Sequence, residues 1–405
     1  MANVLYLVHR MPYPPNKGDK VRSYHLLRHL AAKHRVWLGS FVDDPDDEPH
    51  IDALRPWCVD LHLARLHPRS ARLQSLPALL GDEPLTLRYY RDAGLAQWVQ
   101  AVAARERLDA VVVFSSSMVQ YAEGLGVPVL VDFVDVDSAK WTQYADHHRW
   151  PLSWVYRREG ERLLAYERAV ASRVARSFFA TAQEAELFRC LAPECAARVD
   201  WFGNGVDADF FAPDAARRSP FAAGEIPLVF TGAMDYWPNV DAVTWFAREA
   251  LPALRARWPA LRFHVVGRSP APVVQALAGD AVNVTGTVPD VRPYLQHAAV
   301  VVAPLRLARG IQNKVLEAMA MARPVVASVA CVPPIAARPG VELIAAGDAA
   351  DHVREVDALL RDPARADAIG AAGRAAVLRA HSWPAQLSTL DRHLDALRAR
   401  EPLAA

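Results

Sequence analysis

Cysteines and long apolar runs are scarce in this sequence, and each scarcity excludes a class of protein. Only four cysteines occur among 405 residues, and none stands in a CxxC or Cys/His spacing. This excludes a disulfide-built domain and indicates the reduced thiols of a cytoplasmic protein. No run of about 18 consecutive apolar residues occurs, so no transmembrane helix is expected. The short run Val4–Val8 lacks the basic flank of a signal peptide and predicts a strand.

An excess of charge of one sign is also lacking. The formal net charge is +1, so no global field recruits nucleic acid, and any anion must be bound by local groups. Lysine is rare, because only five of the 46 basic residues are lysine. Lys17, Lys20, Lys140 and Lys314 fall in segments singled out below. Since arginine is otherwise preferred, we expect a compact ammonium group to matter at these positions.

The sequence does contain short β-branched runs that alternate with helical periods over its whole length. Continuous apolar strands between helices favour parallel sheets covered on both faces. The series restarts near Leu228, after an irregular segment, 211–227, that we interpret as a linker. The sequence therefore predicts an α/β protein with two Rossmann-like doubly wound domains, 1–210 and 228–380, facing a central cleft. The expected strands are Asn3–Val8, Arg35–Phe41, Ala110–Phe114, Pro128–Asp132, Ser177–Thr181, Leu228–Thr231, Arg262–Val266, Val282–Thr285, Val300–Ala303 and Pro324–Ala327.

The most informative segment runs from Arg309 to Ser328 and follows an expected strand. No GxGxxG fingerprint occurs in the chain, which argues against a NAD-dependent oxidoreductase. In this segment Gly310 permits a tight turn into a helix. A phosphate can then bind the free N–H groups of Ile311, Gln312 and Asn313 at the helix start.

Charged side chains in the same segment suit a nucleoside diphosphate. Arg309 and Lys314 place cations at the helix start, where they oppose the helix dipole unless an anion is bound. Glu317 lies one turn further along, where its carboxylate can accept hydrogen bonds from a ribose diol. Ordinary solvated charges at a helix end are the alternative. We expect a donor site here, with Lys314 also acting in catalysis by neutralising a departing diphosphate.

This segment resembles the donor-binding signature of glycosyltransferase family 4, retaining enzymes with the two-domain GT-B fold. Glu317-Ala-Met-Ala320 and Pro324-Val-Val326 match the family pattern. Arg309 stands where the family has a first glutamate, which contacts the transferred sugar, and Arg323 stands where it has a glycine. The resemblance implies transfer of a sugar with retention from a nucleoside diphosphate sugar. No metal and no other cofactor is expected.

Other matches extend the resemblance over nearly the whole chain. The run Gly203–Asp207 resembles the family's hinge and makes Asn204 a donor-site candidate. Near the N-terminus a loop resembles the family's glycine-rich first loop, where Gly18 would let the backbone approach the donor phosphate. The C-terminal segment, 381–405, resembles the helix that crosses back onto the first domain.

Two turns of the second domain would complete the donor site. Val265–Gly267 resembles the strand whose glycine-rich end faces the donor, and Arg268 follows it. Val288 lies in a turn that resembles the one receiving the nucleobase. The family's phosphate-binding Arg/Lys pair is missing, with Ala233 and Asn239 in its place. Cations elsewhere in the donor segment would have to replace it.

Three acidic residues after the strand Pro128–Asp132 are the acceptor-side candidates. A carboxylate at a strand end can accept the proton of an acceptor hydroxyl group. The resemblance puts Asp135 near an acceptor-side histidine of the family, with Asp132 as second choice and His9 as third. Two alternatives remain: Asp135 or Asp137 caps the next helix, or both form a metal-binding DxD.

The helical segment Ser153–Val174 is both basic and aromatic. Such a helix suits an enzyme with a lipid-linked acceptor that touches an anionic membrane surface. An ordinary surface helix laced with glutamates is the alternative.

The sequence as a whole predicts a cytoplasmic glycosyltransferase of the hexosyltransferase type. Its acceptor would be a hydroxyl group of a glycan or a lipid-linked molecule, and nucleic acid is not an expected partner. The resemblance is closest to sugar transferases of PEP-CTERM/exosortase exopolysaccharide systems. Peripheral contact with the inner face of the cytoplasmic membrane is a further expectation. A nucleotide-sugar epimerase of the same fold and a non-catalytic nucleotide-sugar-binding protein are the alternatives.

Overall fold

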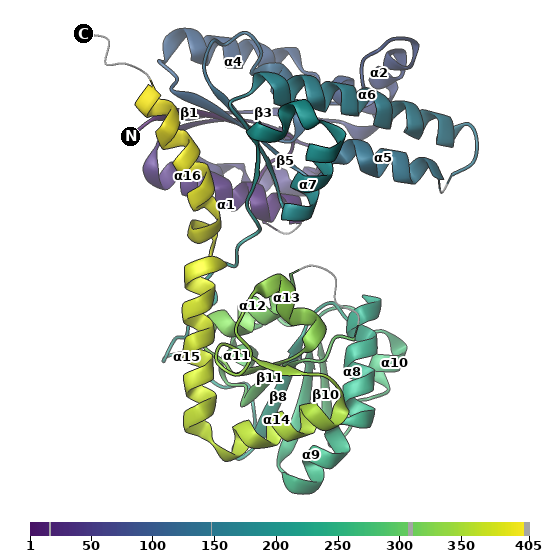
Figure 1. Cartoon of the computed structure of the whole chain (residues 1–405), viewed down its shortest axis with the longest axis vertical. Coiled ribbons are helices and arrows are strands. Elements are labelled where there is room, and N and C mark those ends of the chain that lie inside the picture. The colour runs from purple at the N-terminus through teal and green to yellow at the C-terminus, as the bar shows by residue number, and fades with distance from the viewer. Residues whose placement is uncertain (16–17, 147, 307–310, 401–405) are drawn as a thin grey trace. The chain divides into compact units, whose positions relative to one another are not determined.

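The structure is a computed structural model that describes residues 1–15, 18–146, 148–306 and 311–400. The chain divides into two compact units (Figure 1). Unit 1 contains Met1–Asn204 together with the C-terminal residues from Gln386, and unit 2 contains Gly205–Ala385. In each unit, helices flank a sheet whose strands are all parallel.

Unit 1 has a seven-stranded sheet in the order β3-β2-β1-β4-β5-β6-β7. Its central strand β4 is short and fully apolar, and it is buried along its whole length because helices cover both faces of the sheet. The strands are β1 Asn3–Val8, β2 Arg35–Val42, β3 Asp60–Arg65, β4 Ala110–Phe114, β5 Val129–Val134, β6 Arg176–Phe179 and β7 Val199–Trp201. The helices are α1 Gly18–Lys33, α2 Pro68–Ser75, α3 Leu85–Tyr89, α4 Ala93–Arg105, α5 Asp137–Asp146, α6 Leu152–Arg173, α7 Ala182–Leu191 and most of α16 Trp383–Arg400, with the short 3-10 segments η1 Pro45–Trp57, η2 Leu76–Leu80, η3 Ser116–Tyr121 and η4 Pro193–Arg198.

Unit 2 has a six-stranded sheet in the order β10-β9-β8-β11-β12-β13. The strands are β8 Ile226–Thr231, β9 Leu261–Val266, β10 Val282–Gly286, β11 Val300–Ala303, β12 Val325–Ser328 and β13 Ile344–Ala346. The helices are α8 Trp237–Glu249, α9 Leu251–Arg257, α10 Pro272–Gln275, α11 Arg292–Gln296, α12 Asn313–Ala320, α13 Val332–Ile335, α14 Ala349–Arg361 and α15 Pro363–Ala380, with the 3-10 turn η5 Val329–Cys331.

Both sheets reverse their strand order at one point, between β1 and β4 in unit 1 and between β8 and β11 in unit 2. In doubly wound sheets, ligands bind outside the carboxyl ends of the strands at this point. The predicted pair of Rossmann-like α/β domains is confirmed, and the topology directs attention to the loops after these strands.

The boundary between the units lies between Asn204 and Gly205, whereas the sequence suggested residue 210. The segment interpreted as a linker, 211–227, belongs to unit 2 and is hydrogen-bonded to it. Gln296 on α11 accepts a hydrogen bond from the backbone N–H of Asp214 and donates one to its carbonyl group.

The C-terminal helix α16 returns to unit 1. From Gln386 onward it groups with that unit. Asp391 of α16 contacts two residues of α1, with 2.9 Å to His29 Nε2 and 2.6 Å to Lys33 Nζ. Among the described residues, no helix has the length and apolar character needed to cross a membrane.

Candidate functional site

Unit 2 contains a cavity of about 690 Å³ at the carboxyl ends of β8, β9 and β10, which we call the unit 2 cavity. The first turn of α12 closes its other side. The lining residues are Thr231, Gly232, Ala233, Tyr236, Asn239, Val266, Gly267, Arg268, Thr287, Val288, Val291, Ile311, Gln312, Asn313, Lys314 and Glu317.

Helix α12 has one face in the core and one at the cavity. Val315, Leu316 and the Ala318–Ala320 run are buried in the hydrophobic core of unit 2. Lys314 lies in the first turn of the helix, and Glu317 lies one turn further along. The helical period therefore places both side chains on the face that borders the cavity. No side-chain hydrogen bond from Gln312 caps the helix start. A helix start that faces a cavity in this way favours an anion.

The two charged side chains of α12 are held in a desolvated environment. The Lys314 ammonium donates a hydrogen bond to Asn239 Oδ1 and lies 4.3 Å from the ring centroid of Phe230. Burial lowers the pKa of Lys314 to about 8, and burial raises the pKa of Glu317 to about 7. Within the described part of the chain, no ion pair involves either residue. Both groups are therefore poised for a ligand that carries the complementary groups.

Two glycines bring backbone and side chains unusually close together beneath this cavity. A Cβ atom on Gly267 would lie 1.7 Å from the carbonyl oxygen of Gly232. A Cβ atom on Gly232 would lie 2.9 Å from Lys314 Nζ and 2.8 Å from Asn239 Nδ2. Any larger residue at either position would therefore displace the backbone or the Lys314–Asn239 contact.

The cavity gathers seven of the predicted donor-site residues. These are Arg268, Val288, Ile311, Gln312, Asn313, Lys314 and Glu317. Two others, Arg309 and Gly310, lie outside the described residues. The remaining two belong to unit 1, where Gly18 begins α1 and Asn204 accepts a hydrogen bond of 3.0 Å from Arg22.

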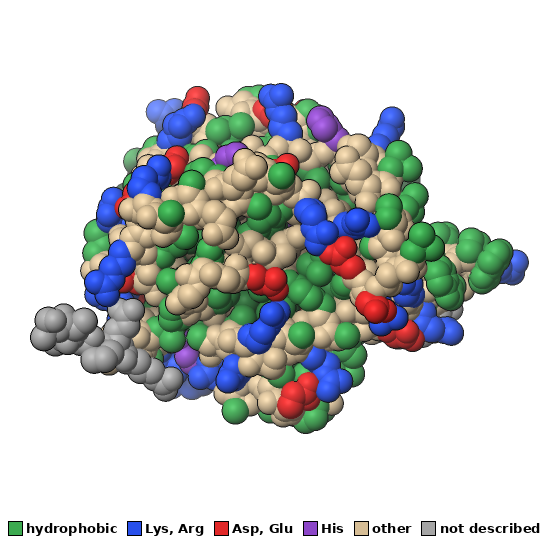
Figure 2. Space-filling model, turned by 90° about the horizontal axis from the view of Figure 1, so that it is seen from above, with side chains coloured by type: hydrophobic (Ala, Val, Ile, Leu, Met, Phe, Trp, Pro, Cys, Tyr) green, Lys and Arg blue, Asp and Glu red, His purple; other side chains and the backbone are tan. Residues whose placement is uncertain are grey.

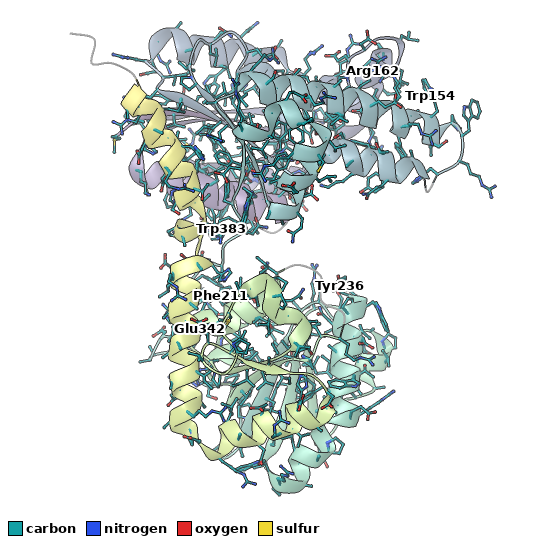
Figure 3. The ribbon with its side chains drawn as sticks, in the orientation of Figure 1. Trp154, Arg162, Phe211, Tyr236, Glu342 and Trp383 are labelled. Carbon is teal, nitrogen blue, oxygen red and sulfur yellow. The ribbon has the colours of Figure 1, made fainter. Side chains whose placement is uncertain are left out.

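Sequence reasoning missed two side chains of the unit 2 cavity. Tyr236 lies before α8 with 60% of its surface exposed (Figure 3), and Thr287 follows β10. The only signal for them is their position directly after, or near, a strand end. Asn239 was interpreted only as the replacement of a cation, but its side chain binds Lys314.

Unit 1 contains a second cavity, of about 510 Å³, which we call the unit 1 cavity. It lies beyond the carboxyl ends of β1 and β4 and is bounded by residues of α2, α3, α5 and α6. Its walls are largely aromatic. The lining residues are His9, Arg72, Ser75, Leu85, Thr86, Tyr89, Tyr90, Ser115, Asp137, Lys140, Trp141, Tyr144 and Leu163. Ser115 has a φ of 79°, a conformation that non-glycine residues adopt mostly at functional turns.

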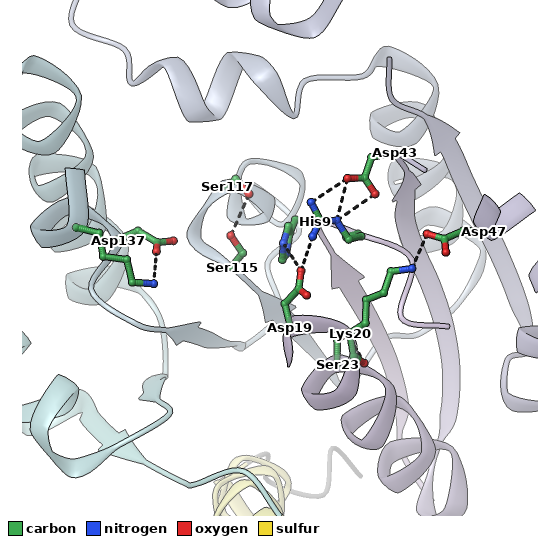
Figure 4. A network of polar contacts seen from close by, with 11 residues as sticks. His9, Asp19, Lys20, Ser23, Asp43, Asp47, Ser115, Ser117 and Asp137 are labelled. Carbon is green, nitrogen blue, oxygen red and sulfur yellow. Dashed lines mark hydrogen bonds and ion pairs between the residues drawn. The ribbon is translucent and has the colours of Figure 1, made fainter. Parts of the chain in front are cut away.

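His9 enters the unit 1 cavity from the end of β1, as the sequence suggested. Its ring stacks on Phe114 with 5.7 Å between the centroids, and Nε2 lies 3.7 Å from Asp19 (Figure 4). Burial lowers the pKa of His9 to about 4, so its imidazole is neutral at physiological pH. Arg10 bonds Asp19 at 2.7 Å and Asp43 at 2.9 Å, which neutralises both carboxylates.

Asp132, the second acceptor-side candidate, is bound to Arg22. Both oxygens of its carboxylate accept hydrogen bonds from Arg22, at 2.8 and 3.2 Å, and the side chain is 2% exposed. Its Oδ1 also accepts from the N–H of Val134, a β-branched residue with a φ of 71°. The Asp132–Arg22 pair fixes the turn that carries Asp135.

Asp135 and Asp137 are joined by one cation. Lys140 Nζ lies 2.6 Å from Asp135 Oδ2 and 3.1 Å from Asp137 Oδ1. Lys140 thereby fills the place that a metal ion would take between the two carboxylates in the DxD interpretation. Across residues 1–15, 18–146, 148–306 and 311–400, no group of three or more His, Cys, Asp or Glu side chains could hold a metal ion.

Several residues of unit 1 were not found from the sequence. Arg22 lies on α1 and gives no sign of its buried partner 110 residues away. Tyr89 and Tyr90 follow no strand, so the rule that ligands bind after strands does not find them.

Residues 225–362 match the family model described as Glycosyl transferases group 1. Among curated proteins, none matches the chain. Solved structures resemble the chain along nearly its whole length. Sucrose-phosphate synthase from Thermosynechococcus elongatus has a TM-score of 0.61 and 18% identity, covering 98% of this chain and 100% of that one. HepE of Anabaena in complex with UDP has a TM-score of 0.62 and 13% identity, covering 97% and 100%. A glycosyltransferase from Rickettsia africae has a TM-score of 0.64 and 12% identity, covering 99% and 100%.

At such low identities the structural likeness shows the fold, and the family match is confined to unit 2. Both observations support a glycosyltransferase. The chain therefore has the GT-B fold of glycosyltransferases, and its unit 2 carries the region that matches the family Glycosyl transferases group 1.

Proposed function

We propose that this chain is a retaining glycosyltransferase that transfers a hexose from a nucleoside diphosphate sugar to a hydroxyl group of a glycan or lipid-linked acceptor. We assign it to the cytoplasm and to exopolysaccharide biosynthesis. The observation that carries the donor assignment is the unit 2 cavity, where the partly buried Lys314 and Glu317 share one wall with a helix start. The structures of HepE with UDP and with UDP-glucose support a donor of this class.

The residues of the unit 2 cavity divide into three tasks in this proposal. The first turn of α12 and Lys314 hold the diphosphate, since N–H groups and an ammonium both stabilise its charge. Glu317 accepts hydrogen bonds from the ribose diol. Val288 and Arg268 border the nucleobase. Because negative charge grows on the diphosphate as the glycosidic bond breaks, Lys314 stabilises the transition state more than the bound donor.

On the acceptor side, Asp135 is the proposed residue that orients the hydroxyl group. Lys140 holds its carboxylate, and the Asp132–Arg22 pair fixes the turn on which it stands. The proposed reaction needs no metal, since Lys140 bonds both carboxylates of the DxD run and Lys314 serves the leaving group. Full activity in excess EDTA is the expected result.

Glu317→Ala tests the donor site directly. We expect the variant to lose about 1.5–3 kcal/mol of binding free energy for a nucleoside diphosphate, the usual loss for hydrogen bonds to a charged group. Isothermal titration calorimetry with a panel of nucleotides measures it. Glu249→Ala, an exposed glutamate at the end of α8, is the matched control. Unchanged affinity in a folded Glu317→Ala protein would move the donor site elsewhere.

The reaction class is tested with a panel of nucleotide sugars, with and without extracted acceptors. Sugar transfer that requires an acceptor is expected. Release of a modified sugar without an acceptor would indicate an epimerase. Binding without any turnover would indicate a nucleotide-sugar-binding protein.

A further inference from the structure

Large apolar side chains are exposed on two neighbouring segments of unit 1. On α2 and η2, Leu73, Leu76 and Leu80 are 68%, 51% and 94% exposed. On the connection into α6 and its first turn, Trp150, Leu152 and Trp154 are 80%, 49% and 52% exposed. We call these six residues the apolar patch. Water contact at so many large side chains is unfavourable, which marks a surface that another phase or molecule covers.

Hydrogen bonds and an ion pair hold the two segments of the patch together. Arg158 on α6 is buried and donates to the carbonyl groups of Ala78 and Gly81, at the end of η2. Arg162, one turn further, lies 2.7 Å from Asp82. Trp154 precedes Arg158 by one helical turn and so lies on the same face of α6 (Figure 3). The segment that carries the exposed leucines is therefore bonded directly to the helix that carries Trp154.

The end of the α5–α6 pair is a firm support for the exposed tryptophans. Both helices run side by side away from the sheet of unit 1 (Figure 1). A Cβ atom on Gly160 would lie 2.5 Å from Thr142 Oγ1, so the helices are in close contact. Tyr156 packs against Trp141 and Tyr144 with ring centroids 5.4 and 6.4 Å away. The tryptophans are thus presented on packed helices.

The surroundings of the patch are basic. The segments 68–82 and 148–162 contain six arginines against three acidic residues, whereas the whole chain has a net charge of only +1. Asp82 is paired with Arg162, and Glu159 is buried, where it accepts from the backbone N–H groups of Leu85 and Thr86. Figure 2 shows hydrophobic and basic side chains together on a projecting edge of the molecule.

We propose that the apolar patch docks on the surface of an anionic lipid bilayer. Tryptophan and leucine enter the boundary between headgroups and acyl chains, while arginines such as Arg69 and Arg149 stay at the phosphate level. The patch and the unit 1 cavity share helix α2, which carries Leu73 of the patch as well as Arg72 and Ser75 of the cavity wall. An acceptor at the bilayer surface would therefore reach this cavity from the membrane. This last consequence, a lipid-linked acceptor, rests on the proposed glycosyltransferase function.

Vesicle flotation of the full chain tests the proposal. We expect binding to vesicles that contain phosphatidylglycerol, and weaker binding to pure phosphatidylcholine vesicles. Trp150→Ser/Trp154→Ser should lower the partition coefficient at least about tenfold, since two large apolar side chains are removed. Arg149→Gln should lower it about fivefold on anionic vesicles. Trp201→Ser, which alters an indole of unit 1 that is 43% exposed and outside the patch, is the matched control and should bind as the parent chain does.

Calorimetry with nucleoside diphosphate separates this proposal from the donor-site proposal, because the double variant should keep the parent affinity. The membrane proposal is overturned if the parent chain ignores anionic vesicles or if the double variant binds them equally well. It is also overturned if sedimentation shows a dimer of the parent chain that the double variant loses, since the patch would then pair two copies of the chain.

Discussion

The two cavities treat their charged groups in opposite ways. In unit 1, Lys140 at the cavity wall contacts Asp135 and Asp137, and Arg22 pairs with Asp132 elsewhere in the unit. In unit 2, Lys314 has a neutral amide and an aromatic ring as neighbours, and no described acidic group lies within ion-pair distance of it. Two carboxylates thus contact Lys140 at the unit 1 cavity. Lys314 at the unit 2 cavity forms no ion pair with a described residue, although the carboxylate of Glu317 lines the same cavity.

Paired and unpaired charges have opposite effects on the free energy of unfolding. A paired buried charge contributes to the fold, and its loss leaves a partner stranded. An unpaired buried charge costs stability, and proteins keep such groups where a ligand needs them. We infer that the unit 2 cavity is built around an anionic ligand, whereas the unit 1 cavity has an aromatic wall suited to an uncharged one.

The largest effect should come from breaking the balance in unit 1. Arg22→Ala would leave the carboxylate of Asp132 buried without its cation, and we expect a loss of about 3–5 kcal/mol in the free energy of unfolding. Denaturant unfolding measures this loss. Arg55→Ala, at an exposed ion pair with Asp52, is the matched control and should cost less than about 1 kcal/mol. Equal small losses in both variants would mean that the Arg22–Asp132 pair does not order the turn.

In unit 2, removal of a cation should lower turnover without lowering the free energy of unfolding. Lys314→Met removes a buried ammonium that has no anionic partner, so the free energy of unfolding should stay constant or rise by about 1 kcal/mol. Turnover should fall about 10²–10³-fold, as when one group that stabilises a developing anion is lost. Steady-state kinetics and unfolding of the same preparation measure both. A destabilised variant with normal turnover would reverse the contrast between the units.

A substitution on the proposed acceptor side should have a smaller effect on turnover than Lys314→Met. Asp135→Asn should leave nucleotide affinity unchanged and slow transfer about 10²-fold, within the usual range for a group that assists proton transfer. Donor binding by calorimetry and transfer rates separate the two. Asp52→Asn, at a fully exposed position of unit 1, is the control and should change neither. Transfer at the parent rate by Asp135→Asn would leave that residue a structural role only and direct attention to His9.

The pH dependence should sharpen the contrast further. Glu317 is ionised above its pKa of about 7, and Lys314 is protonated below its pKa of about 8. Below the first value the ribose loses its charged acceptor, and above the second the diphosphate loses its cation. The parameter kcat/KM should therefore peak between these values and fall about tenfold per pH unit on either side. In Lys314→Met the alkaline limb should disappear, and an unchanged limb would assign it to another group.

The sequence predicted the central strands of both sheets but missed β3, β7 and β13. The central strands are continuous apolar runs because both of their faces are covered, and this pattern is visible without a structure. The missed strands are short or lie at an edge, and β3 is only partly buried. Their residues resemble those of loops, since one face or edge meets water.

The donor segment was also predictable in part. Lys314 and Glu317 were identified because the helical period alone puts them at a helix start after a strand. The helix itself begins at Asn313, three residues after Gly310, where the turn was expected and which lies outside the described residues. Helix starts depend on local capping, and this one has no side-chain cap to mark it.

By itself the sequence determined the alternation of strands and helices, the restart that makes two units, and the place of Lys314 and Glu317 at the start of a helix. These properties follow from residue period and from neighbours close in the chain. Only the tertiary structure decided which charges are neutralised. Asp132 accepts a hydrogen bond from Arg22, 110 residues away in the chain, and Lys314 donates one to Asn239, 75 residues away. Arg158 joins the two segments of the apolar patch. Ion pairing and desolvation of a side chain depend on contacts between distant segments. The same aspartate or lysine is therefore paired in one fold and unpaired in another, according to which side chains lie beside it.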